Sequence, residues 1–136
     1  MRGPFNEWLG LTFVEASADE VVATITIRPA LHQPYGLVHG GVYASVIEAV
    51  CSTGAAIAAG ARGYTAVGAE NNTCFLKAVR EGTLTVVARP LSNGRRTQVW
   101  TADIRDERGA LIAQGRVRTI GIEPGAALAG QLVEVK

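Results

Sequence analysis

The chain has 136 residues, 48% of them hydrophobic and 18% charged, a composition typical of one globular domain with a hydrophobic core. Its 13 basic residues nearly balance its 12 acidic residues, which argues against a protein that binds nucleic acid or a membrane surface. The two cysteines, Cys51 and Cys74, offer no disulfide framework, and residues 1–10 lack the apolar stretch of a signal peptide. We therefore expect a cytoplasmic protein.

Two extended segments are predicted near the start of the chain. The first, 11–15, is short. The second, 20–28, alternates Val, Ala and Ile with threonine, the pattern of a half-buried strand. Pro29 ends this strand, and 30–38 is expected to be an irregular loop.

A long helix is predicted from Gly40 to Ala59, closed by glycines at 60 and 63. Apolar side chains cover nearly its whole circumference, and a helix of this kind is buried on all sides. One stripe, spaced i, i+4, i+7 and i+11, is not aliphatic: Gly41, Ser45, Glu48 and Ser52. This stripe should face a cavity or another subunit.

Four further strands with glycine-containing turns follow the helix, at 65–78, 83–89, 97–105 and 111–120. The tail from Glu123 is expected to pack weakly or to be disordered. One helix and about six strands, most of them antiparallel neighbours, predict an α+β fold. Residues 1–121 should form a single domain, followed by a short tail, 122–136.

Glu48 is the leading candidate for a functional residue. No basic residue occurs between Val42 and Gly60, and an unpaired carboxylate in an apolar helix is costly to bury. Such groups are often found at functional sites. A structural ion pair with an arginine from the sheet is the alternative.

The start of the helix offers a second chemical feature. Unpaired N–H groups at the first turn carry the positive end of the helix dipole, and glycine lets a ligand approach the backbone closely. The Gly40 N–H could polarise a carbonyl oxygen, and Glu48 of a neighbouring subunit could attack that carbonyl or deprotonate water. Alternatively, Gly40 and Gly41 only permit tight packing, His39 is a core histidine, and Ser52 bonds to its own backbone.

Other kinds of site have less support in the sequence. The two histidines and two cysteines lack metal-ligand spacing, and no phosphate-binding loop, dinucleotide motif or nucleophile elbow occurs, so we expect no metal and no cofactor. A nucleophile built from Cys74 and a histidine remains possible. Between Lys77 and Arg118, nine basic residues outnumber four acidic ones, which suits an anionic small molecule or simply keeps strand edges soluble.

Taken together, these segments resemble the hotdog-fold acyl-CoA thioesterases. The resemblance rests on Gln33, HGG at 39–41, Glu48 and Ser52, and on two later segments, NNTCFLKAVREG (71–82) and NGRRTQVWTADIRDERGALIAQG (93–115). Within that family the chain is similar to the PaaI-like branch, which includes phenylacetyl-CoA and Arthrobacter-type 4-hydroxybenzoyl-CoA thioesterases. One departure is Ala78, where the family strand often has proline.

The resemblance implies a fold, an assembly and an activity. The fold is a hotdog fold, with one long central helix wrapped by a curved antiparallel sheet of about five to six strands. Dimers pair edge to edge, often assemble further into homotetramers, and hold active sites at the dimer interface. The expected activity is hydrolysis of aryl- or fatty-acyl-CoA to the free acid and CoA.

The resemblance also implies roles for particular residues. Glu48 would be the catalytic carboxylate, and the Gly40 N–H would polarise the thioester carbonyl. His39 would shape the loop at the helix start, Gln33 would lie near the thioester, and the Ser52 hydroxyl would help to place water or the carboxylate.

The same resemblance places the CoA nucleotide and phosphates at Gly94, Arg95, Arg96 and Thr97, with Lys77 as a further candidate. Two other functions remain open. A hotdog hydratase or dehydratase would need acid–histidine signatures that this sequence lacks. A non-catalytic acyl-CoA-binding sensor usually carries a DNA-binding module, for which this chain has no room.

Overall fold

The computed structural model describes residues 3–133. Its two main helices are α1 (Pro4–Leu9) and α2 (Gly40–Gly60), and a 3-10 turn spans Pro29–Leu31. The strands, in chain order, are β1 (Leu11–Ala16), β2 (Val21–Thr26), β3 (Thr65–Phe75), β4 (Thr83–Asn93), β5 (Thr97–Arg105), β6 (Leu111–Ile122), β7 (Ala127–Leu128) and β8 (Gln131–Leu132).

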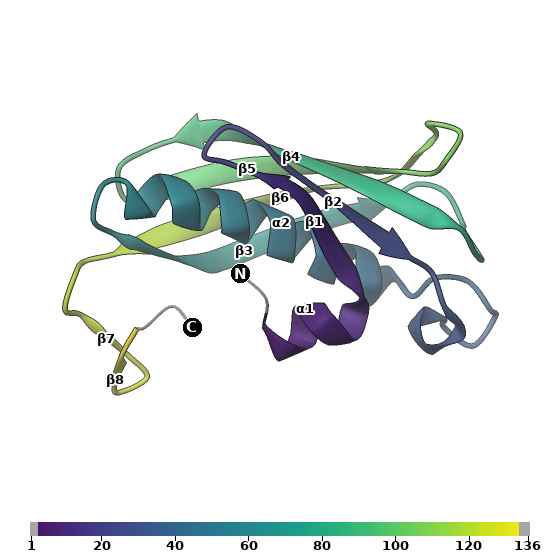
Figure 1. Ribbon diagram of the computed structural model, residues 1–136, viewed down its shortest axis with the longest axis horizontal. Coiled ribbons are helices and arrows are strands. Elements are labelled where there is room, and N and C mark those ends of the chain that lie inside the picture. The colour runs from purple at the N-terminus through teal and green to yellow at the C-terminus, as the bar shows by residue number, and fades with distance from the viewer. Residues whose placement is uncertain (1–2, 134–136) are drawn as a thin grey trace.

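Six strands form one antiparallel sheet in the order β1-β2-β4-β5-β6-β3, and α2 lies across one of its faces (Figure 1). Helix α2 contacts all six of these strands. The predicted α+β architecture, a long central helix wrapped by an antiparallel sheet, is therefore confirmed. Strands β1 and β3 form the two edges of the sheet, so one backbone side of the eleven-residue β3 has no partner strand among residues 3–133.

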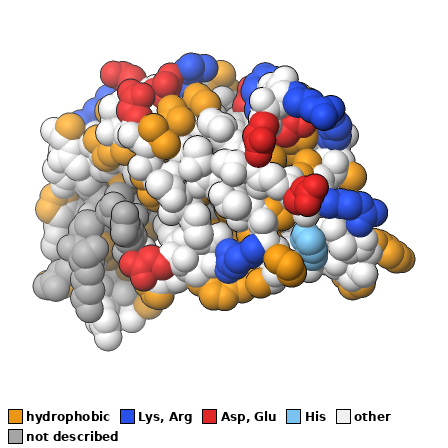
Figure 2. Space-filling model, turned by 45° about the vertical axis from the view of Figure 1, so that its right-hand side comes forward, with side chains coloured by type: hydrophobic (Ala, Val, Ile, Leu, Met, Phe, Trp, Pro, Cys, Tyr) orange, Lys and Arg blue, Asp and Glu red, His pale blue; other side chains and the backbone are white. Residues whose placement is uncertain are grey.

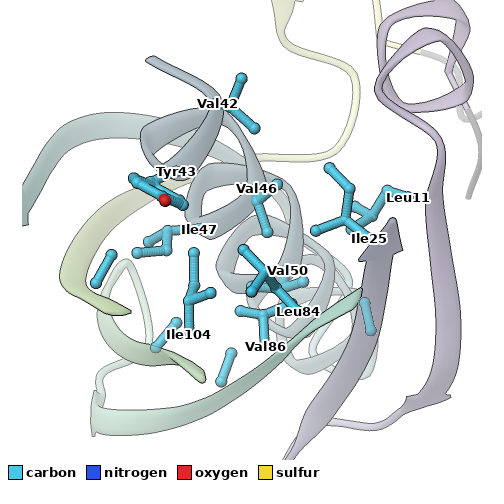
Figure 3. Close-up of a cluster of buried hydrophobic side chains, with 14 of the residues drawn as sticks. Leu11, Ile25, Val42, Tyr43, Val46, Ile47, Val50, Leu84, Val86 and Ile104 are labelled. Atoms are coloured by element: carbon cyan, nitrogen blue, oxygen red, sulfur yellow. The ribbon is translucent and has the colours of Figure 1, made fainter. Parts of the chain in front are cut away.

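The core lies between α2 and the sheet. Val46, Ile47 and Val50 of α2 are fully buried, and Figure 3 shows them facing side chains of β4 and β5. The predicted stripe is the side of α2 that the sheet leaves partly open: Ser45, Glu48 and Ser52 are half-buried, and Gly41 is exposed. Three alanines widen this open side, namely Ala44, Ala49 and Ala56.

Trp100 packs the second half of α2 against the sheet. Its ring is fully buried against Gly54, where any Cβ would overlap the indole. Its Nε1 donates a hydrogen bond to Gln98 Oε1 (2.9 Å), and Gln98 Nε2 donates to the Ala55 carbonyl (3.0 Å). The buried polar atoms of this pair are thus satisfied.

The structure differs from the sequence prediction at both ends of the chain. Helix α1 was not predicted because six residues are too few to show a periodic pattern, although Pro4 in its first turn and Gly10 at its C-cap (φ 79°) are helix signals. The tail from Glu123 was expected to pack weakly or be disordered. Its described part forms the paired strands β7 and β8, whose side chains are mostly exposed, and residues 134–136 lie outside the described residues.

Two strand ends also differ from the prediction. Strand β3 ends at Phe75, three residues before the expected limit. Strand β4 continues past Arg89 to Asn93, with a register shift between Pro90 and Ser92. Such an irregularity accommodates a proline inside a sheet.

Among residues 3–133, α2 is the single helix whose length and apolar composition would suit a membrane span. However, 67% of that apolar stretch is buried inside the fold. Packing against the sheet accounts for its apolar character, as expected for a core helix.

Candidate active site

The Glu48 carboxylate is held by uncharged hydrogen-bond donors. Ser52 Oγ, one helical turn further along α2, donates to Glu48 Oε2 at 2.7 Å. Asn71 Nδ2, from β3, donates to Glu48 Oε1 at 3.2 Å. No ion pair to Glu48 is formed by the lysines and arginines of residues 3–133, so the alternative of an ion pair with an arginine of the sheet is wrong within the chain.

Asn71 and Thr73 were not singled out by the sequence. Asn71 Nδ2 also donates to the Ala44 carbonyl on α2 (3.0 Å), and Thr73 Oγ1 donates to Asn71 Oδ1 (2.7 Å). A four-residue network, Ser52–Glu48–Asn71–Thr73, therefore joins the helix to the edge strand. Two polar residues spaced i, i+2 on a strand beside an apolar helix were the available signal.

Gly68 makes room for the carboxylate on β3. A Cβ at this position would lie 2.6 Å from Glu48 Oε2. The pairing of β3 with β6 shifts register between Gly68 and Glu70, which is a β-bulge or similar irregularity. Bulges commonly re-aim side chains near functional sites, and after this one Asn71 and Thr73 face α2.

The Glu48 carboxylate lines a cavity of about 760 Å³ between α1, α2 and β3. Its lining is mainly apolar or small, and among the described residues that line it Glu48 is the only charged one. The other lining residues are Gly3, Phe5, Asn6, Ala44, Ser45, Ala49, Ser52, Thr53, Ala56, Thr65, Ala66, Val67, Asn71 and Val133. This volume suits a small organic ligand.

The start of α2 has the features expected of a site that donates hydrogen bonds to a ligand. His39 is the N-cap of α2, where its Nδ1 accepts a hydrogen bond from the Gly41 N–H at 2.8 Å. The Gly40 N–H donates no hydrogen bond within residues 3–133. The Phe75 ring lies directly on Gly40, so any Cβ there would overlap it. The histidine thus shapes the first turn while the Gly40 N–H stays available.

Gln33 lies in the loop before this helix. Its Oε1 accepts a hydrogen bond from the Tyr35 N–H, and its backbone N–H donates to the Leu37 carbonyl at 2.7 Å. The loop is also tied to the strand connection through the His32 ring, whose Nε2 lies 2.7 Å from the Arg80 carbonyl oxygen. The Gln33 side chain therefore stabilises the turn to which Gln33 belongs.

The predicted catalytic residues fall into two groups within one chain. Glu48 and Ser52 are in contact, whereas Gly40, His39 and Gln33 belong to the helix start. Gly40 and Glu48 are eight residues apart on α2, or roughly 12 Å along its axis. A single subunit therefore does not bring the two groups onto one small reacting centre.

The residues predicted to bind CoA are also separated. Gly94–Thr97 lie at the β4–β5 connection beside the end of α2, where Arg62 Nη1 donates to the Gly94 carbonyl (3.1 Å). Arg96 pairs with Glu123. Lys77 follows β3 beyond Phe75, which contacts the opposite end of α2, and its Nζ lies 3.8 Å from Asp106. Figure 2 shows basic and acidic side chains interspersed on its face of the molecule.

The structure does not pair Cys74 with a histidine: among the described residues the His32 ring bonds the Arg80 carbonyl, and the His39 ring accepts from the Gly41 N–H. Burial, with a smaller contribution from the charge of Glu48, raises the pKa of the Cys51 thiol, which keeps it protonated. Cys74 is exposed and shares a shallow pocket with Asn72 and Thr101, on the sheet face turned away from α2. Within residues 3–133, no group of three or more His, Cys, Asp or Glu residues could hold a metal ion.

Comparisons with known proteins point to one family. The family model described as Thioesterase superfamily matches residues 35–113. A Mycobacterium tuberculosis protein named "Putative esterase" is 38% identical over 88% of this chain and 87% of its own length. The "Proofreading thioesterase EntH" of Cronobacter sakazakii is 32% identical over 86% of this chain and 85% of that protein.

Solved structures agree with these sequence matches. S. sahachiroi AziG superimposes with a TM-score of 0.86 at 38% identity, covering 89% of this chain and 98% of AziG. A structure described as a thioesterase from Haemophilus influenzae gives a TM-score of 0.80 at 31% identity, covering 88% of this chain and 82% of that one.

The position of Gly68 yields a prediction about the carboxylate. Gly68→Ala should push the Glu48 side chain away from Ser52 and Asn71, because a flexible side chain gives way more easily than the strand. A crystal structure of the variant should show the displaced carboxylate, and any reaction that depends on it should slow by roughly 10-fold or more.

Gly60→Ala is the matched control, because a Cβ there meets no atom within 4 Å. It should leave Glu48 in place. An unmoved carboxylate in Gly68→Ala would contradict the prediction.

Proposed function

Because the chain belongs to the thioesterase superfamily, we propose that it hydrolyses acyl-CoA thioesters to the free acid and CoA. The observation that carries the proposal is the Glu48 carboxylate: within residues 3–133 it is the one charged group lining its cavity, and its hydrogen-bond donors there are neutral. No lysine or arginine of residues 3–133 competes with a substrate for this carboxylate, and the cavity can take an apolar acyl group.

Two routes from Glu48 lead to the same products. In one, a carboxylate oxygen attacks the thioester carbon, the CoA thiolate leaves, and water then hydrolyses the resulting anhydride. In the other, Glu48 accepts a proton from water as the water oxygen attacks, and this proton passes to the departing CoA sulfur. Both routes develop negative charge on the carbonyl oxygen.

The Gly40 N–H is the donor proposed to stabilise that oxygen. It carries the positive end of the α2 dipole and has no acceptor within residues 3–133. The roughly 12 Å between Gly40 and Glu48 on one helix supports a site built by two subunits, each supplying one group. Pairing of two β3 edges about a two-fold axis would run the two α2 helices in opposite directions.

The CoA nucleotide is proposed to lie at the β4–β5 connection. Arg95 and Arg96 are exposed there, and guanidinium groups bind phosphate through charge-assisted hydrogen bonds. Arg96 already pairs with Glu123, so Arg95 is the more available of the two. Lys77, at the other end of α2, could join this site only from a partner subunit.

The first prediction of this proposal concerns Glu48. Glu48→Gln should abolish hydrolysis and leave the fold and the binding of acyl-CoA intact, because only the charge and basicity are lost. A panel of acyl-CoAs assayed with a thiol reagent measures the release of free CoA. Substantial activity in the variant would end the proposal, and tight binding without release by the parent would indicate an acyl-CoA-binding protein.

The second prediction tests whether one site uses two subunits. Gly40→Pro removes the N–H at the first helical position, where proline is tolerated, and His39 already has extended backbone angles (φ −63°, ψ 133°). Mixed dimers of Gly40→Pro and Glu48→Gln, each inactive alone, should recover about a quarter of the parent activity, since half the dimers are mixed and each holds one intact site.

Gly40→Ala is the control for crowding against Phe75, because it keeps the N–H and should retain more activity than Gly40→Pro. Sedimentation should show a dimer or tetramer. Failure of the mixture to recover activity would place the whole site in one subunit, as would an active monomer of 14.3 kDa.

The third prediction concerns the CoA nucleotide. The double variant Arg95→Ala, Arg96→Ala should raise KM for acyl-CoA several-fold with a smaller effect on kcat, because the nucleotide lies far from the reacting carbon. The effect should shrink at high salt and vanish for a short thioester without the nucleotide. Arg89→Ala, which removes a guanidinium paired with Glu20 at 2.8 Å, is the control. Unchanged kinetics in the double variant would move the CoA site elsewhere.

A further inference from the structure

Both polar atoms of the Asn71 side chain form hydrogen bonds at the junction of β3 and α2. Both donors of its amide nitrogen point to the helix, one to the Ala44 carbonyl (3.0 Å) and one to Glu48 Oε1 (3.2 Å). Its amide oxygen accepts from Thr73 Oγ1 at 2.7 Å. An amide has two donor hydrogens and one acceptor oxygen, so each group on Asn71 has a partner.

Two acceptors and one hydroxyl determine which end of the Asn71 amide faces Glu48: the Glu48 carboxylate and the Ala44 carbonyl, which only accept hydrogen bonds, and the Thr73 hydroxyl, which donates. A carboxylate can only accept hydrogen bonds, so an inverted amide would place its oxygen against Glu48 and repel it. The threonine hydroxyl donates to the amide oxygen and favours the productive orientation. Gly115, which pairs with Thr73 across β6, leaves the space for this hydroxyl, since a Cβ there would lie 2.7 Å from Thr73 Oγ1.

Ser52 alone would not fix the carboxylate. It binds only Oε2, whereas rotation about the terminal carbon–carbon bond of glutamate is soft. The second contact, from Asn71 to Oε1, ties the other oxygen to a different element of the fold. Because both donors are neutral, they orient the carboxylate without cancelling its charge.

We propose that Asn71 is a positioning residue that holds the Glu48 carboxylate in its reacting orientation, and that the Thr73 hydroxyl anchors the Asn71 amide from the opposite end. This inference rests on the hydrolytic role proposed for Glu48. Misplacing a catalytic group by about 1 Å costs on the order of 100-fold in rate. The network thus acts on kcat, because Asn71 orients the attacking group and the CoA end of the substrate lies elsewhere.

The kinetic test uses three substitutions and one control. Asn71→Leu should lower kcat for acyl-CoA hydrolysis by about 10- to 100-fold with KM within about twofold. Thr73→Val should lower kcat by a smaller factor, roughly fivefold, because the amide keeps its contacts to α2 but loses the hydrogen bond that anchors its oxygen. Thr73→Ser keeps the hydroxyl and should restore activity close to that of the parent.

Asn72→Leu is the control, because its side chain lies on the opposite face of β3, in the pocket shared with Cys74. It should match the parent. A purely structural role for the network predicts that Thr73→Ser and Thr73→Val lose activity in proportion to their loss of thermal stability. The Thr73 pair also decides the matter if Asn71→Leu does not fold.

A crystal structure of Asn71→Leu separates this inference from the proposed function. The Glu48 carboxylate should leave its parent position. If it stays in place, or if kcat stays within about twofold of the parent, the positioning role is overturned. If the carboxylate moves but the parent protein hydrolyses no acyl-CoA, the proposed function has failed and the structural role of Asn71 stands.

Discussion

The Glu48 carboxylate lies on the helix that the sheet wraps. The need to satisfy this carboxylate constrains the residues around it. Glu48 has apolar residues on either side along α2, and no cation of the described chain pairs with it. Burying such a group is costly unless its oxygens are hydrogen-bonded. Ser52 and Asn71 supply these bonds, and the open side of α2 leaves the carboxylate half-buried.

The edge strand β3 carries the consequences of this constraint. Gly68 has no side chain where the carboxylate lies, and the register shift after it turns Asn71 and Thr73 toward α2. The outer backbone side of the same strand pairs with no other strand in the described part of the chain. An open edge of eleven residues is a natural place for another strand to pair. One strand therefore both seats the carboxylate and offers an edge to a second subunit.

The helix α2 separates the two chemical features by its own length. Its first turn presents the Gly40 N–H, and its middle presents Glu48, about 12 Å away. Since a helix is rigid, these groups cannot approach each other within one subunit. The proposed division of one site between two subunits follows from that rigidity.

Elements with strong periodic patterns and residues with unusual surroundings could be predicted before the fold was known. The apolar helix at 40–59, its polar stripe and Glu48 could all be predicted, because 3.6-residue periodicity and a lone charge are local signals. Helix α1 was too short to show such a pattern. Asn71, Thr73 and Gly68 looked like ordinary strand residues, and only the tertiary structure decided their roles. Their importance comes from packing beside a glutamate that lies 20 or more residues earlier in the chain. Strand pairing sets that contact, through a register shift that no local pattern specifies.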